Sequence, residues 1–299
     1  MTRPPRLSAG LLGQAAGRGR LLLCLDFDGT LSPIVETPHE ARPLPGVRAV
    51  LRSLSAKAPR VSVAVVSGRS VAQLRRLLGP AAGLYLVGTH GVELVGPRGG
   101  RRRLADVGAA RPELARLRAW LRSNVPPRAG FLVEDKGWSI ALHYRKADPQ
   151  AAAALCRSFK RFVARETPAL RLSAGKMVVE AVARAANKGA ALRALRRLVG
   201  ADATAVYFGD DMTDEDAFGA VGPRGISVLV GERAPTRARF RVDGPGAVLQ
   251  LLKKLNASLG RPASRSRGRN VRARAKQAVQ AAAAVCGCGG RAKTSDRAG

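Results

Sequence analysis

Short apolar segments alternate with helical patterns along most of this chain, and this alternation leaves few folds open. The apolar runs cover residues 21–27, 61–66, 84–87, 205–208 and 226–230. Continuous apolar runs of this length are typical of strands that are buried on both faces of a parallel sheet. Residues 47–54 and 71–78 have apolar side chains at helical spacing. The sequence therefore predicts an α/β fold with a Rossmann-like, open parallel sheet and helices on both faces.

The middle of the chain has a different pattern. Residues 96–103 are rich in Gly and Arg and are expected to be a linker. Beyond them, helical patterns alternate with strand pairs over about eighty residues, enough for a modest core of their own. We expect an inserted α+β cap domain. The predicted organisation is a flexible N-terminus (1–19), a core (20–103 and 184–255), the cap (104–183) and a basic, disordered tail (256–299).

The net charge of +31 is extreme for 299 residues. Residues 256–299 hold ten Lys or Arg against one acid, and they have few large aliphatic side chains to offset the entropy of ordering. Such a tail can bind the phosphates of nucleic acid. It holds no aromatic residue on which bases stack. Arg is over-used along the whole chain, so a general bias explains the charge better than a nucleic-acid partner.

The sequence also bears on the compartment. No apolar run approaches the ~20 residues of a membrane helix, so no membrane partner is expected. Cys24, Cys156, Cys286 and Cys288 are scattered and form no disulfide framework. These features favour a reducing, cytoplasmic compartment. A transit peptide is the alternative for the Arg-rich, acid-free start of the chain.

Carboxylates gather at the ends of two predicted strands. Of the 21 acids, seven lie in two short runs, at residues 26–28 and 210–216. Ligands of open parallel sheets bind beyond the carboxyl ends of the strands. In a chain this basic, such clusters indicate a site for a hard cation that prefers oxygen ligands.

The first run contains two aspartates separated by one residue. One of Asp26 and Asp28 can attack a phosphorus atom, since aspartate is a known nucleophile, and the other can act as a general acid and base. Gly29 permits a sharp turn whose amide groups face an anion. An ordinary turn explains these residues equally well when they are taken alone.

Three further residues strengthen the chemical interpretation. Ser67 can donate a hydrogen bond to a phosphoryl oxygen, although a helix N-cap is the simpler explanation. Lys188 begins a helix, where a positive charge opposes the helix dipole. A lysine that is present despite this cost suggests a function. Asp210 precedes the helix whose first turn explains Asp214 and its neighbours, and it can complete a magnesium site.

Together these motifs resemble the trehalose-phosphatase family of the haloacid-dehalogenase-like hydrolases. The resemblance covers residues 21–252 and rests on residues 25–34 (LDFDGTLSPI), 66–70 (VSGRS), 88–93 (GTHGVE), 134–137 (EDKG), 143–145 (HYR), 175–180 (GKMVVE) and 209–218 (GDDMTDEDAF). It implies a phosphoric monoester hydrolase that releases phosphate from trehalose 6-phosphate.

The resemblance also implies roles for individual residues. Asp26 would be the nucleophile and Asp28 the acid and base, while Ser67 and Lys188 would steady the phosphoryl group. Mg²⁺ would bind Asp26, the backbone carbonyl of Asp28, and Asp210. The substrate-binding residues it implies are Gly29, Arg69, His90, Glu134, Lys136, Arg145, Lys176, Glu180 and Asp211. Two alternatives stay open: a phosphatase for another sugar phosphate, or a basic polyanion-binding protein on an inactive phosphatase fold.

Overall fold

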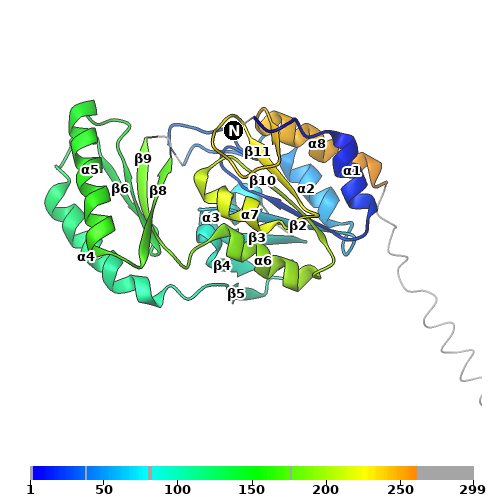
Figure 1. Cartoon of the computed structure of the whole chain (residues 1–299), viewed down its shortest axis with the longest axis horizontal. Helices are drawn as coiled ribbons and strands as arrows, with labels where there is room; N and C mark the ends of the chain where they lie inside the picture. The colour runs from blue at the N-terminus through cyan, green and yellow to red at the C-terminus, as the bar shows by residue number, and fades with distance from the viewer. Residues whose placement is uncertain (1–2, 38, 80–82, 176, 261–299) are drawn as a thin grey trace, which may run out of the picture. The chain divides into compact units, whose positions relative to one another are not determined.

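A large, mostly parallel sheet forms the centre of the computed structural model (Figure 1). The structure describes residues 3–37, 39–79, 83–175 and 177–260. Within these residues the large sheet has the order β12-β11-β10-β1-β2-β3-β4-β5. Its strands are β1 (Leu21–Leu25), β2 (Val61–Val66), β3 (Leu84–Gly88), β4 (Glu93–Val95), β5 (Arg101–Arg103), β10 (Thr204–Gly209), β11 (Ile226–Val230) and β12 (Phe240–Val242).

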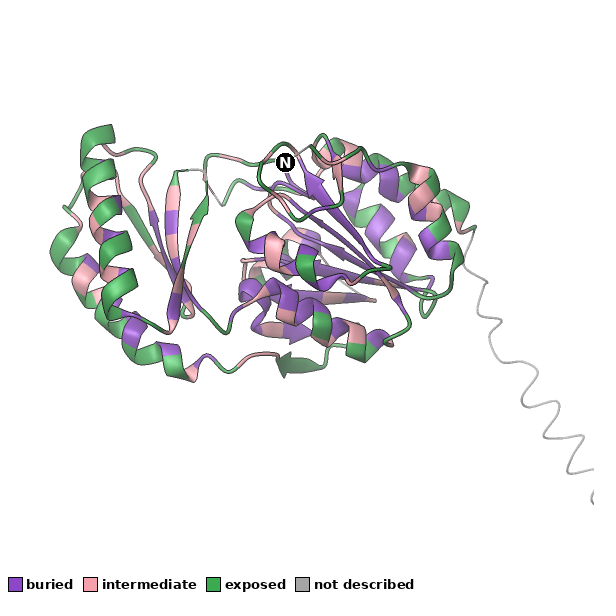
Figure 2. Cartoon of the chain, viewed as in Figure 1, coloured by how far each residue is buried: buried purple, intermediate pink, exposed green. Residues whose placement is uncertain are grey.

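Helices cover both faces of this sheet. They are α1 (Ala9–Gly17), α2 (Val47–Ser55), α3 (Val71–Leu78), α6 (Lys188–Val199), α7 (Glu215–Ala220) and α8 (Pro245–Ser258). Successive residues of β1 point to opposite faces: Leu23 packs with α1, α2, α3 and α8, whereas Leu22 packs with α6 and α7. Because both faces are covered, β1 is apolar throughout. The central strands are accordingly buried along their length (Figure 2).

A second, antiparallel sheet is inserted in the chain between strands β5 and β10 of the large sheet. Its order is β6-β7-β9-β8, with β6 (Leu132–Asp135), β7 (Ser139–His143), β8 (Leu170–Gly175) and β9 (Val178–Ala183). Helices α4 (Arg111–Asn124) and α5 (Pro149–Glu166) pack on one face through a separate apolar cluster that includes Leu117 and Phe159. This α+β unit has its own apolar core.

The register of the large sheet determines where polar residues meet. Strand β1 lies between β10 and β2, with Leu25 opposite Phe208 on one side and Val65 on the other. All three strands are parallel, so Asp26, Ser67 and Asp210 emerge at the same edge. The strand order reverses at β1, and such a position is where open α/β sheets bind ligands.

Three predictions at the boundaries are wrong. The N-terminus is not flexible throughout, because α1 forms there: Ser8 caps the helix and Leu12 is fully buried. The predicted linker at 96–103 includes β5, which pairs antiparallel with β4 and extends the sheet. The predicted tail begins too early, since α8 continues to Ser258. The rest of that tail, residues 261–299, lies outside the described part of the chain.

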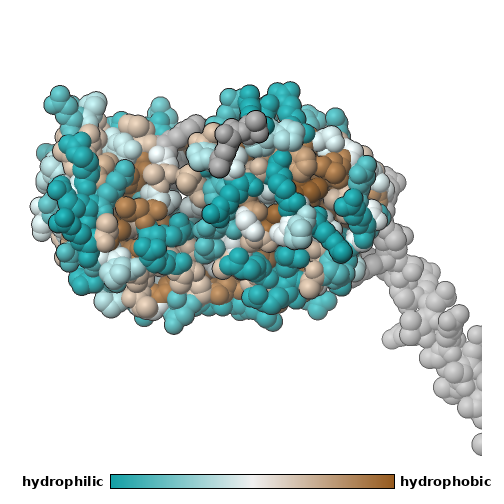
Figure 3. Space-filling model, in the orientation of Figure 1, coloured by the Kyte–Doolittle hydropathy of each residue, from teal (hydrophilic) through white to brown (hydrophobic). Residues whose placement is uncertain are grey.

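The surface has no large continuous apolar region on the face that Figure 3 shows; hydrophobic patches are interspersed with hydrophilic residues. The exposed large hydrophobic side chains among the described residues are Ile34, Leu132, Val133, Leu172, Met177, Leu198 and Met212. None of the described helices has the length and apolar character to cross a membrane.

Candidate active site

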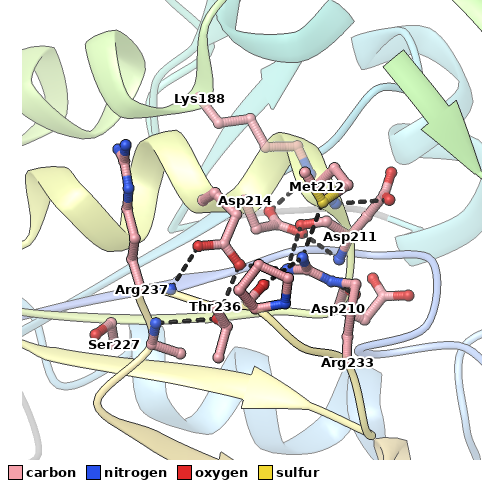
Figure 4. Close-up of polar contacts among 12 residues, drawn as sticks. Lys188, Asp210, Asp211, Met212, Asp214, Ser227, Arg233, Thr236 and Arg237 are labelled. Atoms are coloured by element: carbon pink, nitrogen blue, oxygen red, sulfur yellow. Dashed lines mark hydrogen bonds and ion pairs between the residues drawn. The ribbon is translucent and has the colours of Figure 1, made fainter. Parts of the chain in front are cut away.

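The buried centre of the site is a hydrogen-bonded group of four side chains. The Lys188 ammonium, at the start of α6, donates to Asp26 Oδ1 and to Asp214 Oδ1, each at 2.8 Å. Figure 4 shows Lys188 reaching toward Asp214. The Tyr207 hydroxyl in β10 donates to the same Asp214 oxygen at 2.8 Å. Burial disfavours the charged amine, but the carboxylates of Asp214 and Asp26 raise the pKa of Lys188 above its ordinary value. The lysine is therefore held as an ammonium beside Asp26.

Helix α6 places Lys188 although its charge opposes the helix dipole. The side chain of Asn187 caps the helix by accepting a hydrogen bond from the Ala190 amide at 2.8 Å. It also donates to Asp216 Oδ2 at 2.8 Å and so links α6 to α7. The two buried carboxylates compensate the unfavourable position of the lysine, which explains why the sequence tolerates it there.

Asp28 is held by a bidentate ion pair. Arg69 donates from Nε to Asp28 Oδ2 and from Nη2 to Asp28 Oδ1, both at 2.7 Å. The guanidinium also lies over the Phe27 ring, 5.4 Å from its centroid. The Asp28 side chain is 43% exposed, so it faces solvent at the mouth of the site while Asp26 is buried. The two aspartates thus have different environments, as two different chemical roles require.

Asp210 lies against the backbone of Gly29. Gly29 has φ +73°, and a Cβ added there would lie 2.0 Å from Asp210 Oδ2. Only glycine fits this close approach. Burial, reinforced by the neighbouring Asp214, raises the pKa of Asp210 to about 8. Carboxylates are therefore crowded at this point of the sheet edge.

The crowded carboxylates suit a hard cation. One oxygen from each of Asp26, Asp210 and Asp214 lies within 4.8 Å of the others. Both oxygens of Asp214 accept hydrogen bonds, from Lys188 and Tyr207 at one oxygen and from the Asp211 amide at the other. Of these three residues, Asp26 and Asp210 are therefore the ones with carboxylate oxygens left for a metal. An all-oxygen donor set of this kind fits Mg²⁺.

Ser67 and Asp211 complete the core side of the site. Ser67 is buried at the end of β2, and its hydroxyl accepts a hydrogen bond from the Arg69 amide at 3.2 Å. The Asp211 carboxylate accepts from the Met212 amide at 2.7 Å and starts the short helix η3 (Met212–Asp214). Burial is the main cause that raises the pKa of Asp211.

The cap contributes a cluster of charges around Glu180. Glu180 Oε1 accepts from Lys136 Nζ at 3.0 Å and from the Ser139 hydroxyl at 2.6 Å. Burial opposes ionisation, yet His90 and Lys136 hold the pKa of Glu180 well below its usual range. A hydrogen bond with His143, 3.1 Å from its Oε2, lowers the pKa of Glu134.

His90 connects the core to this cluster. It is in the short helix η1 (Thr89–Gly91), where both Thr89 and His90 have positive φ, an unusual backbone for such side chains. The ring is buried, and Nε2 lies 3.6 Å from Glu180 Oε2. Neither ring nitrogen has a closer hydrogen-bond partner among the described residues. A buried imidazole with this backbone conformation therefore has hydrogen-bonding capacity to offer a ligand.

The structure brings most of the predicted residues together, with two exceptions. Arg145 is exposed and makes no hydrogen bond or ion pair with the described residues, and Lys176 lies outside the described part of the chain. Sequence reasoning missed Tyr207, Arg233 and the role of Glu215. A tyrosine inside an otherwise apolar strand was the available signal for Tyr207, since a buried hydroxyl needs a partner.

The arrangement of the sheet and the inserted unit is the fold of haloacid-dehalogenase-like proteins. A solved haloacid-dehalogenase-like hydrolase from B. subtilis has the same fold, with a TM-score of 0.58 and 16% identity over 78% of this chain and 98% of that chain. The C-terminal domain of C. albicans trehalose-6-phosphate phosphatase also has this fold, with a TM-score of 0.75 and 24% identity over 85% of this chain and 99% of that domain.

Sequence comparisons narrow the class. The sequence model of trehalose-phosphatases matches residues 24–245. A trehalose-phosphate phosphatase of Mycolicibacterium paratuberculosis is 38% identical over 277 residues, which are 87% of this chain and 69% of that protein. A solved trehalose-6-phosphate phosphatase from Aspergillus fumigatus is 29% identical, with a TM-score of 0.63 over 86% of this chain and 100% of that chain. The chain belongs to the trehalose-phosphatase family, a family of phosphoric monoester hydrolases.

Proposed function

We propose that this chain is a Mg²⁺-dependent phosphatase that hydrolyses trehalose 6-phosphate through an aspartyl-phosphate on Asp26. The observation that supports this most directly is the buried contact of Asp26 with Lys188, 2.8 Å apart, at the edge where β1 and β10 end. The ammonium orients the nucleophile and provides positive charge beside the phosphoryl group. Phosphoryl transfer depends mainly on such positioning and charge neutralisation.

The reaction has two balanced steps. First, a carboxylate oxygen of Asp26 attacks phosphorus, the bond from phosphorus to the sugar oxygen breaks, and Asp28 gives its proton to that oxygen. Then Asp28 takes a proton from water, the water oxygen attacks phosphorus, and Asp26 leaves as a carboxylate. Lys188 and Ser67 steady the phosphoryl oxygens in both steps.

Asp26, Asp210 and the Asp28 backbone carbonyl are the groups that would hold Mg²⁺. When bound, the cation neutralises charge on the phosphoryl oxygens and the surrounding carboxylates. The three clustered carboxylate oxygens support this assignment.

The bidentate ion pair sets a condition on the first step. Both oxygens of Asp28 accept hydrogen bonds from Arg69. Asp28 must gain a proton before it can act as an acid, and a protonated oxygen cannot accept from the guanidinium in the same way. We therefore infer that Arg69 gives up one of these bonds during turnover and turns that donor toward the substrate phosphate.

The cap charges support a sugar phosphate as substrate. Glu134 in β6 and Glu180 in β9 both lie opposite Ala141 of β7, so they are on the same face of the cap sheet. Lys136 is two residues after Glu134 and therefore continues that face. Together with His90 they offer several hydrogen-bond donors and acceptors to sugar hydroxyls. A polar site of this kind rejects analogues that lack the matching hydroxyls. Arg145 and Lys176 are proposed to join this set on the family resemblance alone.

The test is phosphate release in the presence of Mg²⁺. Wild-type protein is compared with Asp26→Asn and with Asp202→Asn, which removes a surface carboxylate paired with Arg20. We expect release from trehalose 6-phosphate, much less from glucose 6-phosphate, loss in Asp26→Asn and full activity in Asp202→Asn. Trapping of labelled phosphate on wild-type protein but not on Asp26→Asn would support the covalent step. Release from glucose 6-phosphate alone would mean that the substrate is a different sugar phosphate. No release from either compound would refute the proposal.

A further inference from the structure

We propose that Arg233 is a positioning residue that, held by Glu215, fixes the backbone of Asp210 and Asp211 and so directs their carboxylates into the site. The inference rests on the proposed function, because it assigns these two residues to metal and substrate. Arg233 lies in the loop between β11 and β12, outside the sequence motifs that resemble the family. Figure 4 shows its guanidinium among the residues that follow β10.

The guanidinium of Arg233 contacts several consecutive residues of that segment. Nε donates to the Asp210 carbonyl at 3.4 Å, and Nη2 donates to the Asp211 carbonyl at 3.3 Å. Nη1 lies 2.9 Å from the Met212 sulfur and donates to the Pro235 carbonyl at 3.3 Å. A planar guanidinium with five donors can serve these acceptors at once, which an ammonium cannot.

Glu215 holds the guanidinium in this orientation. Its Oε1 pairs with Arg233 Nη2 and accepts from the Thr236 hydroxyl at 2.8 Å. Its Oε2 accepts from the Arg237 amide at 2.7 Å. The Glu215 and Arg233 side chains are 13% and 22% exposed, so the pair is largely shielded from water. The acids at 214–216 fit the first turn of a helix, and Glu215 has this second role as well.

The Asp210 side chain has little room to move. Its carboxylate lies against Gly29, where even one added carbon would come within 2.0 Å. On the inner side, Asp214 accepts from the Asp211 amide at 3.0 Å. On the outer side, Arg233 holds the two carbonyls. The segment is thus fixed from both sides, and loss of the outer contacts frees the two aspartates to shift.

A positioning role and a simple charge effect predict opposite changes in Mg²⁺ affinity when Arg233 is replaced. Removing the positive charge of Arg233 makes the acidic cluster more negative, and charge alone would then tighten Mg²⁺ binding. Loss of positioning weakens it, because partners behind metal ligands commonly contribute tenfold or more to affinity. Arg237 provides the matched control: it lies in the same loop, is exposed, and its guanidinium makes no hydrogen bond or ion pair with the described residues.

The experiment measures the rise in Tm as Mg²⁺ is titrated into substrate-free protein, alongside kcat and KM for trehalose 6-phosphate. We expect Arg233→Met to raise the half-saturating Mg²⁺ concentration by about tenfold. We also expect kcat to fall by about tenfold with KM changed less than about twofold, while Arg237→Met matches wild type. Arg233→Lys, which keeps the charge, should still weaken Mg²⁺ binding, and it provides the test if Arg233→Met does not fold.

The outcomes separate the two proposals. If wild type responds to Mg²⁺ and the Arg233 variants show unchanged or tighter Mg²⁺ binding, Arg233 is only a structural contact and the inference is overturned while the proposed function stands. If Arg237→Met weakens Mg²⁺ binding as much as Arg233→Met, the effect is not specific to the contacts of Arg233 and the inference is overturned. If wild type neither responds to Mg²⁺ nor releases phosphate, the proposed function fails and the inference fails with it.

Discussion

Replacing Gly29 with alanine tests how closely Asp210 must be placed. The added Cβ would lie 2.0 Å from Asp210 Oδ2, 2.3 Å from Cγ and 2.8 Å from Oδ1. Rotating the carboxylate cannot relieve three such contacts, so Asp210 has to move by more than about 1 Å before ordinary packing distances return. A displacement of that size in a site of this kind costs about 100-fold in rate. We expect kcat for trehalose 6-phosphate to fall by about that factor.

A second glycine isolates this effect from backbone strain. Gly99, in the turn between β4 and β5, has φ +86°, and nothing lies within 4 Å of an added Cβ. Gly99→Ala should therefore lose about 1 kcal/mol of unfolding free energy, measured in urea, and keep wild-type kcat. Gly29→Ala should lose at least as much stability and lose activity as well. Activity of Gly29→Ala within about threefold of the Gly99→Ala control would refute the reasoning.

Other substitutions test the buried charges, each by urea unfolding. Lys188→Met leaves Asp26 and Asp214 unpaired inside the protein and should cost about 3–5 kcal/mol; a loss below about 1 kcal/mol would contradict the paired network. Tyr207→Phe removes one donor to a buried carboxylate and should cost about 1.5–3 kcal/mol. Glu180 has a pKa lowered from its ordinary value of 4.5, so the folded state binds its proton less readily than the unfolded state. The stabilisation from ionised Glu180 is therefore present above about pH 4.5 and is lost as the pH falls below that value. The difference in unfolding free energy between wild type and Glu180→Gln should shrink from pH 6 to pH 3.5. A difference that stays constant over this range would contradict the lowered pKa of Glu180.

Much of the fold follows from local pattern because a buried parallel strand has an unmistakable sequence. Strands β2 and β11 and helix α3 have the predicted bounds, since each is a compact apolar or amphipathic run with clear ends. Helix α1 was missed because its stretch is rich in glycine. Packing of Leu12 against the core outweighs that weak propensity. The Ser8 cap was the local signal for it.

The candidate site also contains residues that the sequence predicts and residues that it does not. Asp26, Ser67 and Asp210 are predictable, because the ends of parallel strands meet at one edge whatever the details of packing. The contact between Arg233 and Glu215 is not, since arginines are abundant in this chain and nothing local marks which one turns toward the site. The positive φ of Thr89 and His90 is equally hidden, because neither residue favours that backbone and only the surrounding structure imposes it.

The charges of the site also bear on the order in which its ligands bind. When ionised, Asp26, Asp210, Asp211 and Asp214 carry four negative charges, and the Lys188 ammonium contacts two of these carboxylates. Burial and crowding raise the pKa values of Asp26, Asp210 and Asp211, so the cluster resists full ionisation without a cation. The fully ionised group with Lys188 sums to −3, and a phosphate monoester brings nearly two more negative charges at neutral pH.

Carboxylates ionised in this buried region repel a phosphate unless a cation neutralises them, since the interior screens charges poorly. We therefore expect metal to be needed for binding as well as for chemistry. The test is calorimetric titration of trehalose 6-phosphate into Asp26→Asn, which cannot form the phosphoenzyme. Binding should weaken by about tenfold or more when Mg²⁺ is replaced by a chelator at matched ionic strength, although this variant has already lost one negative charge. Equal affinity with and without Mg²⁺ would mean that the cap holds the substrate without help from the metal, and that the carboxylate cluster does not control binding of the phosphate.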